Sequence, residues 1–257
     1  MSGPSLHVFP KVFKCPDLFY DVYYFEIVGH RGAPGQAPEN TLLSFERAIR
    51  TGVDWIELDV RRSRDGVLVV IHDEMVDRTT DGSGRVSDMG FGELERLDAG
   101  AGQRIPSLQQ VVDLAKGRVK MDIEIKEKGI EEDVVNTIKK NGIESQCMVS
   151  SFSYDSIKKV KELCPRLVTA AIMDEMPEDV EKYMDTLLGV DTRILMLSKK
   201  IVTEPFIGEA RRLGFSLGIW NADTTAEIER YAAMDPEYLC SNYPEMLVEF
   251  RQAHSIV

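Results

Sequence analysis

Residues 54–73 read DWIELDVRRSRDGVLVVIHD. It holds two β-rich runs, and the short connection between them contains Asp65-Gly66, a signal for a tight hairpin turn. The connection is too short for a helix. The two runs are therefore predicted to pair as antiparallel strands.

Outward from this hairpin, short β-rich runs alternate with helical patterns along most of the chain. One predicted helix covers residues 40–52, with Asn40 or Thr41 as its cap and Gly52 as its stop. The candidate strands are residues 24–29, 54–60, 66–72, 119–126, 147–152, 167–173, 193–198, 215–220 and 237–242.

These nine strands are one too many for an eight-stranded barrel, and the hairpin accounts for the extra one. The sequence thus predicts an α/β fold, a (β/α)8 TIM barrel with a hairpin and a small insertion after strand two, at about residues 73–106. Residues 1–22 are predicted to be an N-terminal extension, and residues 23–257 the barrel domain.

Composition excludes several classes of protein. The chain of 257 residues has 31 Lys and Arg against 43 Asp and Glu, a formal net charge of −12, and no basic stripe, so nucleic acid is not an expected partner. No apolar run is long enough to span a membrane, and no secretion signal opens the chain, which predicts a cytoplasmic protein, as a monomer or homodimer. Its four scattered cysteines are predicted to be buried rather than metal-binding.

The strand at residues 54–60 has two carboxylates on one face. Side chains alternate along a strand, so Glu57 and Asp59 share a face, and the apolar face is expected to pack on helices. By the same alternation Asp122, Glu124 and Lys126 point into the barrel from residues 119–126. Buried charges need a countercharge, and Glu57, Asp59 and Glu124 suit Mg²⁺ or Ca²⁺, with Mn²⁺ also possible. The alternative is a one-sided sheet with its acids in solvent, which Asp122 taken alone fits better.

Two histidines end strands at the same predicted mouth. His30 follows the first strand and His72 ends the hairpin, and a histidine pair beside acids is suited to proton transfer. Arg31 and Lys126 add positive charge that matches phosphate oxygens. Such a set suits phosphodiester cleavage, although either cation could instead be a structural partner of the acids. Whether Glu39 reaches the site is left open.

With these residues in place, the sequence resembles the glycerophosphodiester phosphodiesterase family over about residues 26–250. The motifs that match are GHRG (29–32), PENTLLSFERAI (38–49), IELDVRRSRDGVLVVIHD (56–73), TTDGSGRV (79–86), LDAG (97–100), IPSLQQVVDLA (105–115), IEIK (123–126), SSF (150–152) and GIWN (218–221). No single motif is specific for this family, but the combination of these motifs in this order is.

The resemblance implies a metal-dependent enzyme that hydrolyses glycerophosphodiesters to glycerol 3-phosphate and an alcohol. The implied roles are His30 and His72 as general acid and base, Glu57, Asp59 and Glu124 as metal ligands, Arg31 and Lys126 as phosphate contacts, and Phe152 and Trp220 as walls of the glycerol pocket. The two aromatic residues would equally suit a simple core.

The chain departs from the family at Asn242, where the family usually has an aspartate, which leaves the charge at that position in question. The same residues are compatible with two other functions. One is a lysophospholipase D-like phosphodiesterase acting on lipids, and the other is a protein that binds glycerophosphodiesters without cleaving them.

Overall fold

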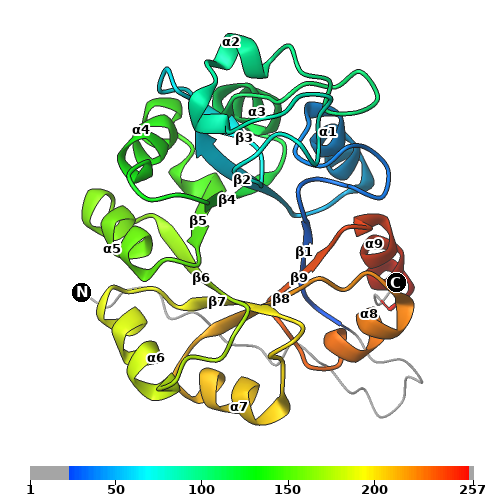
Figure 1. Ribbon diagram of the computed structural model, residues 1–257. Coiled ribbons are helices and arrows are strands. Elements are labelled where there is room, and N and C mark those ends of the chain that lie inside the picture. The colour runs from blue at the N-terminus through cyan, green and yellow to red at the C-terminus, as the bar shows by residue number, and fades with distance from the viewer. Residues whose placement is uncertain (1–22, 255–257) are drawn as a thin grey trace.

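The computed structural model describes residues 23–254, in which eight parallel strands close into a barrel surrounded by helices (Figure 1). The strands are β1 (Glu26–Gly29), β2 (Trp55–Arg62), β3 (Leu68–Val70), β4 (Lys120–Ile125), β5 (Cys147–Ser151), β6 (Val168–Met173), β7 (Ile194–Ser198), β8 (Ser216–Trp220) and β9 (Tyr238–Ser241). The sheet runs β1-β9-β8-β7-β6-β5-β4-β2-β3, and pairing of β1 with β2 closes the ring. β3 pairs antiparallel with β2 and stands outside the ring. The predicted barrel with its hairpin is confirmed.

Helices connect successive strands of the ring. They are α1 (Leu42–Thr51), α2 (Phe91–Leu94), α3 (Leu108–Ala115), α4 (Glu131–Asn141), α5 (Tyr154–Leu163), α6 (Val180–Gly189), α7 (Glu204–Arg212), α8 (Thr225–Ala232) and α9 (Pro244–Ala253), with short 3₁₀ turns η1 (Val86–Asp88) and η2 (Glu144–Gln146). α1 begins after Thr41, whose side chain accepts from the backbone of Ser44, and it ends at Gly52 in a left-handed conformation. Thr41 is therefore the cap, and Asn40 is not.

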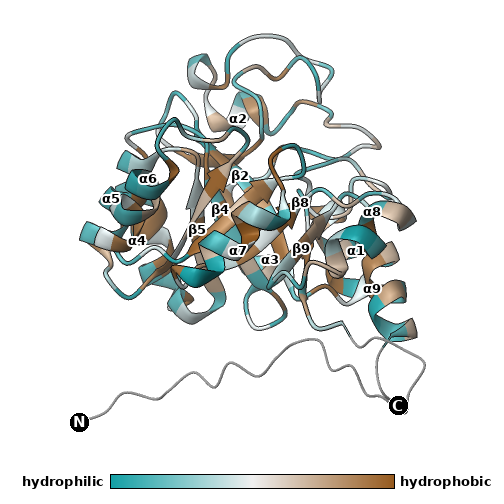
Figure 2. Cartoon of the chain, turned by 90° about the horizontal axis from the view of Figure 1, so that it is seen from below, coloured by the Kyte–Doolittle hydropathy of each residue, from teal (hydrophilic) through white to brown (hydrophobic). Residues whose placement is uncertain are grey.

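Two apolar layers position the strands, one between the ring and the helices and one inside the ring. Ile56, Leu58 and Val60 of β2 pack in the outer layer, whereas Trp55 belongs to the inner one. Figure 2 shows the apolar strands at the centre and the hydrophilic faces of the helices outside. Both faces of β2 are thus buried, and its acidic side chains point into the barrel.

Residues 71–107, which we call the inserted segment, connect β3 with α3 and contain η1 and α2. The segment packs on a small core of its own, with β3 contributing Val69 and the segment contributing Ile71, Val76, Val86, Leu94 and Ile105. The predicted insertion at about residues 73–106 falls within it. The predicted extension, residues 1–22, lies outside the described residues.

The cysteines and the lengths of the helices can be compared with the predictions made from composition. Cys147, Cys164 and Cys240 are buried and free, as predicted, and Cys15 lies outside the described residues. None of the helices between residues 23 and 254 is long and apolar enough to cross a membrane.

Candidate active site

A pocket at the C-terminal ends of the strands brings the predicted site residues together. His30 follows β1, Lys126 follows β4 and Phe152 follows β5. The lining residues are His30, Arg31, Glu57, His72, Asp122, Glu124, Lys126, Phe152, Ile172, Met196, Trp220 and Cys240. The empty space in the pocket is about 430 Å³, and this figure includes the part that is open to solvent.

Three buried carboxylates form an acidic centre at this pocket, and Glu57 and Glu124 line the pocket whereas Asp59 does not. Asp59 and Glu124 are partners in the register of β2 with β4, and Glu57 lies two residues before Asp59 on the same face. Each of the three offers an oxygen, and these oxygens lie within 4.8 Å of one another. Glu57 Oε1 and Asp59 Oδ1 are buried with no hydrogen-bond partner among the described residues. An all-oxygen set with two such atoms fits a hard divalent cation.

Burial and mutual repulsion set the protonation of these acids. Burial, and then the charge of Asp59, raises the pKa of Glu57 well above its usual value and that of Glu124 to about 8. Burial would also raise the pKa of Asp59, but Lys126 and Arg31 outweigh it and the pKa is lowered. The centre therefore has one firmly ionised carboxylate and two that hold protons readily.

Arg31 and Lys126 lie against these acids. Arg31 Nε is 3.3 Å from Asp59 Oδ2, and its backbone N–H donates to Glu57 Oε2 at 2.7 Å. Lys126 Nζ is 2.7 Å from Glu124 Oε1 and 3.5 Å from Asp59 Oδ1. Both cations are thus ion-pair partners of the acids and also line the pocket.

His30 is held from behind and faces the acids. Its Nδ1 lies 2.7 Å from Asn242 Oδ1, and its Nε2 lies 4.0 Å from Glu57 Oε2. Burial, followed by the positive charge of Arg31, lowers the pKa of His30 to about 4. His30 is therefore neutral near pH 7 and has one ring nitrogen available to accept a proton.

His72 has a different environment. Its Nδ1 lies 2.5 Å from Asp73 Oδ1. Burial lowers the pKa of His72, while the charge of Asp59 and the hydrogen bond to Asp73 act in the opposite direction. The two histidines thus line one pocket with different partners, an amide for His30 and a carboxylate for His72.

Aromatic and acidic residues complete the wall. Phe152 and Trp220 meet edge to face with ring centroids 6.3 Å apart, and Phe152 is 49% exposed at the rim. Asp122 is buried and accepts from Ser150 Oγ at 2.6 Å, and burial raises its pKa to about 7. The inward direction that alternation predicts for Asp122 is therefore confirmed, and the alternative of a solvent-facing acid was wrong, because β4 is buried on both faces.

The sequence model of the glycerophosphoryl diester phosphodiesterase family matches residues 30–246. The chain belongs to this family. The resemblance drawn from the motifs is thereby confirmed, and the relatives in this family are enzymes.

Individual relatives agree over most of their length. The glycerophosphodiester phosphodiesterase of Caldanaerobacter subterraneus subsp. tengcongensis is 35% identical, with 86% of this chain and 96% of the relative covered. A glycerophosphodiester phosphodiesterase from Agrobacterium tumefaciens, known from a crystal structure, is 29% identical in sequence. Its structure matches this one with a TM-score of 0.76, covering 88% of this chain and 99% of that one. A phosphodiesterase of Oleispira antarctica, solved with the product sn-glycerol-3-phosphate, shares the fold with a TM-score of 0.80 at 24% identity, over 89% and 96% of the two chains.

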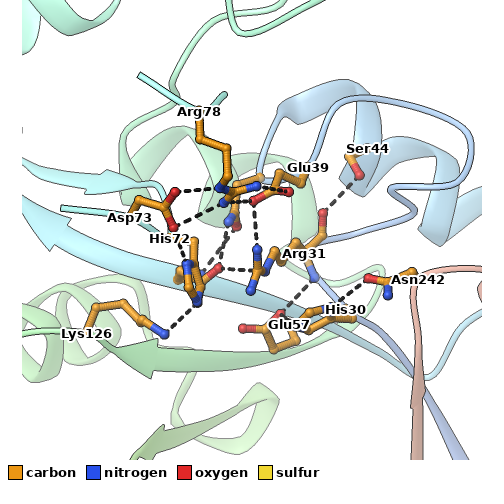
Figure 3. A network of polar contacts seen from close by, with 12 residues as sticks. His30, Arg31, Glu39, Ser44, Glu57, His72, Asp73, Arg78, Lys126 and Asn242 are labelled. Carbon is orange, nitrogen blue, oxygen red and sulfur yellow. Dashed lines mark hydrogen bonds and ion pairs between the residues drawn. The ribbon is translucent and has the colours of Figure 1, made fainter. Parts of the chain in front are cut away.

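The structure adds residues that the sequence reasoning missed. Figure 3 shows Arg78 of the inserted segment between Asp73 and Glu39. Arg78 Nε is 2.5 Å from Asp73 Oδ2, and its terminal nitrogens donate to Glu39 at 2.7 and 2.9 Å. Glu39 in turn accepts from Arg31 at 2.8 Å. Glu39 therefore reaches the site through Arg31, and Arg78 links the partners of His72 and Arg31.

Two further residues orient the loop after β1. Asn40 is buried and donates through Nδ2 to Asp59 Oδ2 at 2.7 Å. Ser44 of α1 donates to Arg31 O at 2.9 Å and accepts from Ala33 N at 2.8 Å. The N-terminal end of α1 thus fixes the backbone on which Arg31 stands.

Proposed function

We propose that this protein hydrolyses glycerophosphodiesters to glycerol 3-phosphate and an alcohol, with Glu57, Asp59 and Glu124 holding a divalent cation. The observation that supports this most directly is the pair of histidines beside the buried acidic centre in one pocket. Mg²⁺ and Ca²⁺ are the cations whose preference for oxygen ligands matches the set, and Mn²⁺ is a third candidate. The bound cation would offset the negative charge of the phosphodiester.

The two histidines divide the proton transfers in this proposal. His30, neutral and bound to an amide, accepts the proton of the attacking hydroxyl. His72, beside the carboxylate of Asp73, donates a proton to the oxygen of the leaving alcohol. Arg31 and Lys126 bind the phosphate, and Phe152 and Trp220 pack on the glycerol carbons.

Two attacking groups fit the same residues, water or the 2-hydroxyl of the glycerol itself. We favour the 2-hydroxyl, with a cyclic phosphate that is opened afterwards, because a neighbouring hydroxyl already held in place reacts as if at very high concentration. A diester that lacks this hydroxyl distinguishes the routes, since unimpaired turnover of it would exclude the cyclic one.

The first test is release of glycerol 3-phosphate from glycerophosphocholine and glycerophosphoethanolamine. The assay is run with EDTA and then with Mg²⁺, Ca²⁺ or Mn²⁺ restored singly. Metal-dependent release supports the proposal and identifies the cation. No release by folded protein with any cation would contradict it, and lysophospholipids would be assayed next.

Substitution His30→Ala separates catalysis from binding alone. Hydrolysis should fall at least 100-fold, as is usual on loss of a general base, while calorimetry still detects the metal. Unchanged hydrolysis would remove His30 from the mechanism. A wild-type protein that binds the diesters without cleaving them would instead be a binding protein.

A further inference from the structure

We propose that Asp223 is a positioning residue for His30, acting through the side-chain amide of Asn242. The proposal rests on the proposed function, in which His30 accepts a proton. Asp223 lies between β8 and α8, and Asn242 directly follows β9. Asp223 itself does not line the pocket, so its effect is on the orientation of His30 rather than on substrate.

The carboxylate of Asp223 is fixed by three donors. Its Oδ1 accepts from the backbone N–H of Asn242 at 2.8 Å and from Ser241 Oγ at 3.0 Å. Its Oδ2 accepts from Asn242 Nδ2 at 2.7 Å. A carboxylate can only accept, so the NH₂ group of Asn242 must be the part of the amide that faces it.

This orientation determines which ring nitrogen of His30 carries the proton. With its NH₂ group on Asp223, the Asn242 amide presents Oδ1 to His30 Nδ1 at 2.7 Å, as Figure 3 shows. Because an amide oxygen can only accept, Nδ1 must carry the hydrogen. In the neutral ring the lone pair is then on Nε2, which lies on the side of Glu57 at 4.0 Å.

A neighbouring amide agrees with this tautomer only in the opposite orientation. Asn221 Nδ2 lies 3.2 Å from His30 Nδ1, and two donors cannot bond to each other. Asn221 Oδ1 is buried and has no partner among the residues described. The tautomer set by Asn242 therefore requires the Asn221 amide to be turned by 180°, which brings its unpartnered oxygen to His30 Nδ1.

The backbone around Asn242 has supports that do not involve the Asp223 carboxylate. His30 N donates to Ser241 O at 3.0 Å, and Gly35 N donates to Asn242 O at 3.0 Å. Loss of the carboxylate should therefore free the Asn242 amide to rotate while the strands stay in place. His30 would then occupy both tautomers, and one of them has a hydrogen where the lone pair is needed.

Exchanging the side chains of Asp223 and Asn242, singly and together, and measuring the kinetics tests these contacts. In Asp223→Asn, two amides face each other and either orientation is possible, so kcat should fall about 10- to 100-fold with KM unchanged. In Asn242→Asp alone, two carboxylates repel each other. In the double variant the amide at position 223 donates to the carboxylate at position 242, which accepts from His30 Nδ1. The double variant should recover most of the lost kcat.

A nitrogen-15 NMR spectrum of the imidazole rings reads the tautomer without any activity. The signals of His30 are assigned by their loss in His30→Gln. The wild type should show the Nδ1–H form, and Asp223→Asn should show a mixture. If the wild type cleaves no diester, the proposed function fails, but this spectrum still decides the role of Asp223.

The matched control is Asp54→Asn, the same chemical change at the opposite end of the barrel. Asp54 immediately precedes β2 and accepts from the backbone of Ile27 in β1 at 2.8 Å. The kcat of Asp54→Asn and the tautomer of its His30 should equal those of the wild type. An Asp223→Asn variant that keeps both, or a double variant no more active than either single one, would overturn the proposal.

Discussion

At the scale of single residues, the buried acids have a consequence for metal binding. Near pH 7 the metal-free site holds protons, because the pKa of Glu124 is raised to about 8 and that of Glu57 is raised well above its usual value. A cation binds the ionised carboxylates, so it must displace these protons.

We therefore expect Mg²⁺ binding at pH 7 to release protons. Affinity should rise as pH rises through about 8, where Glu124 ionises, since its raised pKa means that the cation competes with a proton below that pH. Calorimetry in two buffers of different ionisation enthalpy counts the protons released. Proton-neutral binding at pH 7 would show that the acids are already ionised in the metal-free protein.

Arg78 is a second residue whose role the geometry makes testable. Its removal in Arg78→Ala leaves Asp73 beside His72 and Glu39 beside Arg31 without their common partner. We expect kcat to fall about tenfold and stability to change by less than about 1 kcal/mol, because the ion pairs are partly exposed.

Added guanidinium at low millimolar concentration should restore part of the activity of Arg78→Ala. The control is Arg85→Ala, which removes an exposed pair with Glu74 in the same inserted segment and should keep wild-type kcat. Equal losses in both variants would mean that the segment as a whole, rather than Arg78, supports the site.

At the scale of elements, the turn between β1 and α1 constrains the site closely. Gly32 has φ of 89°, and a Cβ there would lie 2.5 Å from Ser44 Oγ and 2.6 Å from its carbonyl carbon. Only glycine fits, because both the conformation and the close approach of α1 exclude a side chain. The loop that presents His30 and Arg31 therefore requires glycine at this position, and also at Gly29, where a Cβ would lie 2.4 Å from Gly32 O.

Gly32→Ala should lower both stability and kcat. Gly66, in the β2–β3 hairpin, has φ of 88° but nothing within 4 Å of its Cβ position, so Gly66→Ala measures the backbone strain alone. We expect Gly66→Ala to cost about 1–2 kcal/mol and Gly32→Ala to cost about 1–3 kcal/mol more. Denaturant unfolding measures both, and equal costs would contradict the close approach to Ser44.

The alternation of residues 54–60 predicted the direction of each side chain on β2, because a barrel buries both faces of its strands. No such period describes Arg78 or Asp223, which reach the site from loops and act through neighbours 39 and 19 positions away. Asn40 was predictable as a possible helix cap, but its role beside Asp59 depends on a left-handed backbone, φ 56°, that the sequence does not reveal.

At the scale of the whole molecule, α9 supports the point where the ring closes. Leu247 of this helix is fully buried in the outer apolar layer. Arg251 donates to Phe25 O at 3.2 Å and pairs with Asp54 at 2.5 Å, so the last helix is attached to the start of the first strand.

Leu247→Ala should lower the free energy of unfolding by about 2–5 kcal/mol, since it leaves a cavity at this closure. Glu249→Ala, at an exposed position of the same helix, should change it by less than about 0.5 kcal/mol. Denaturant titration of the two variants gives both values. A small loss of unfolding free energy in Leu247→Ala would show that closure of the barrel does not depend on this contact.

The number of strands was predictable at this scale because the hairpin at Asp65-Gly66 is a local signal. The closure was predictable only as part of the barrel fold. Pairing of β1 with β9 joins Gly29 to Ser241, and no local pattern records a contact over that distance in the chain.

The same closure makes the starting point of the polypeptide arbitrary. β1 lies beside β9, and the rings of Tyr23 and His254 are 5.5 Å apart, so a short linker could join these two positions. New termini could then open at Gly66, where the hairpin turn leaves free space. Such a circular permutant would hold every contact of the acidic centre while β2 and β3 stood at opposite ends of the gene. The geometry of the site then requires the barrel but not this particular order of the strands in the sequence.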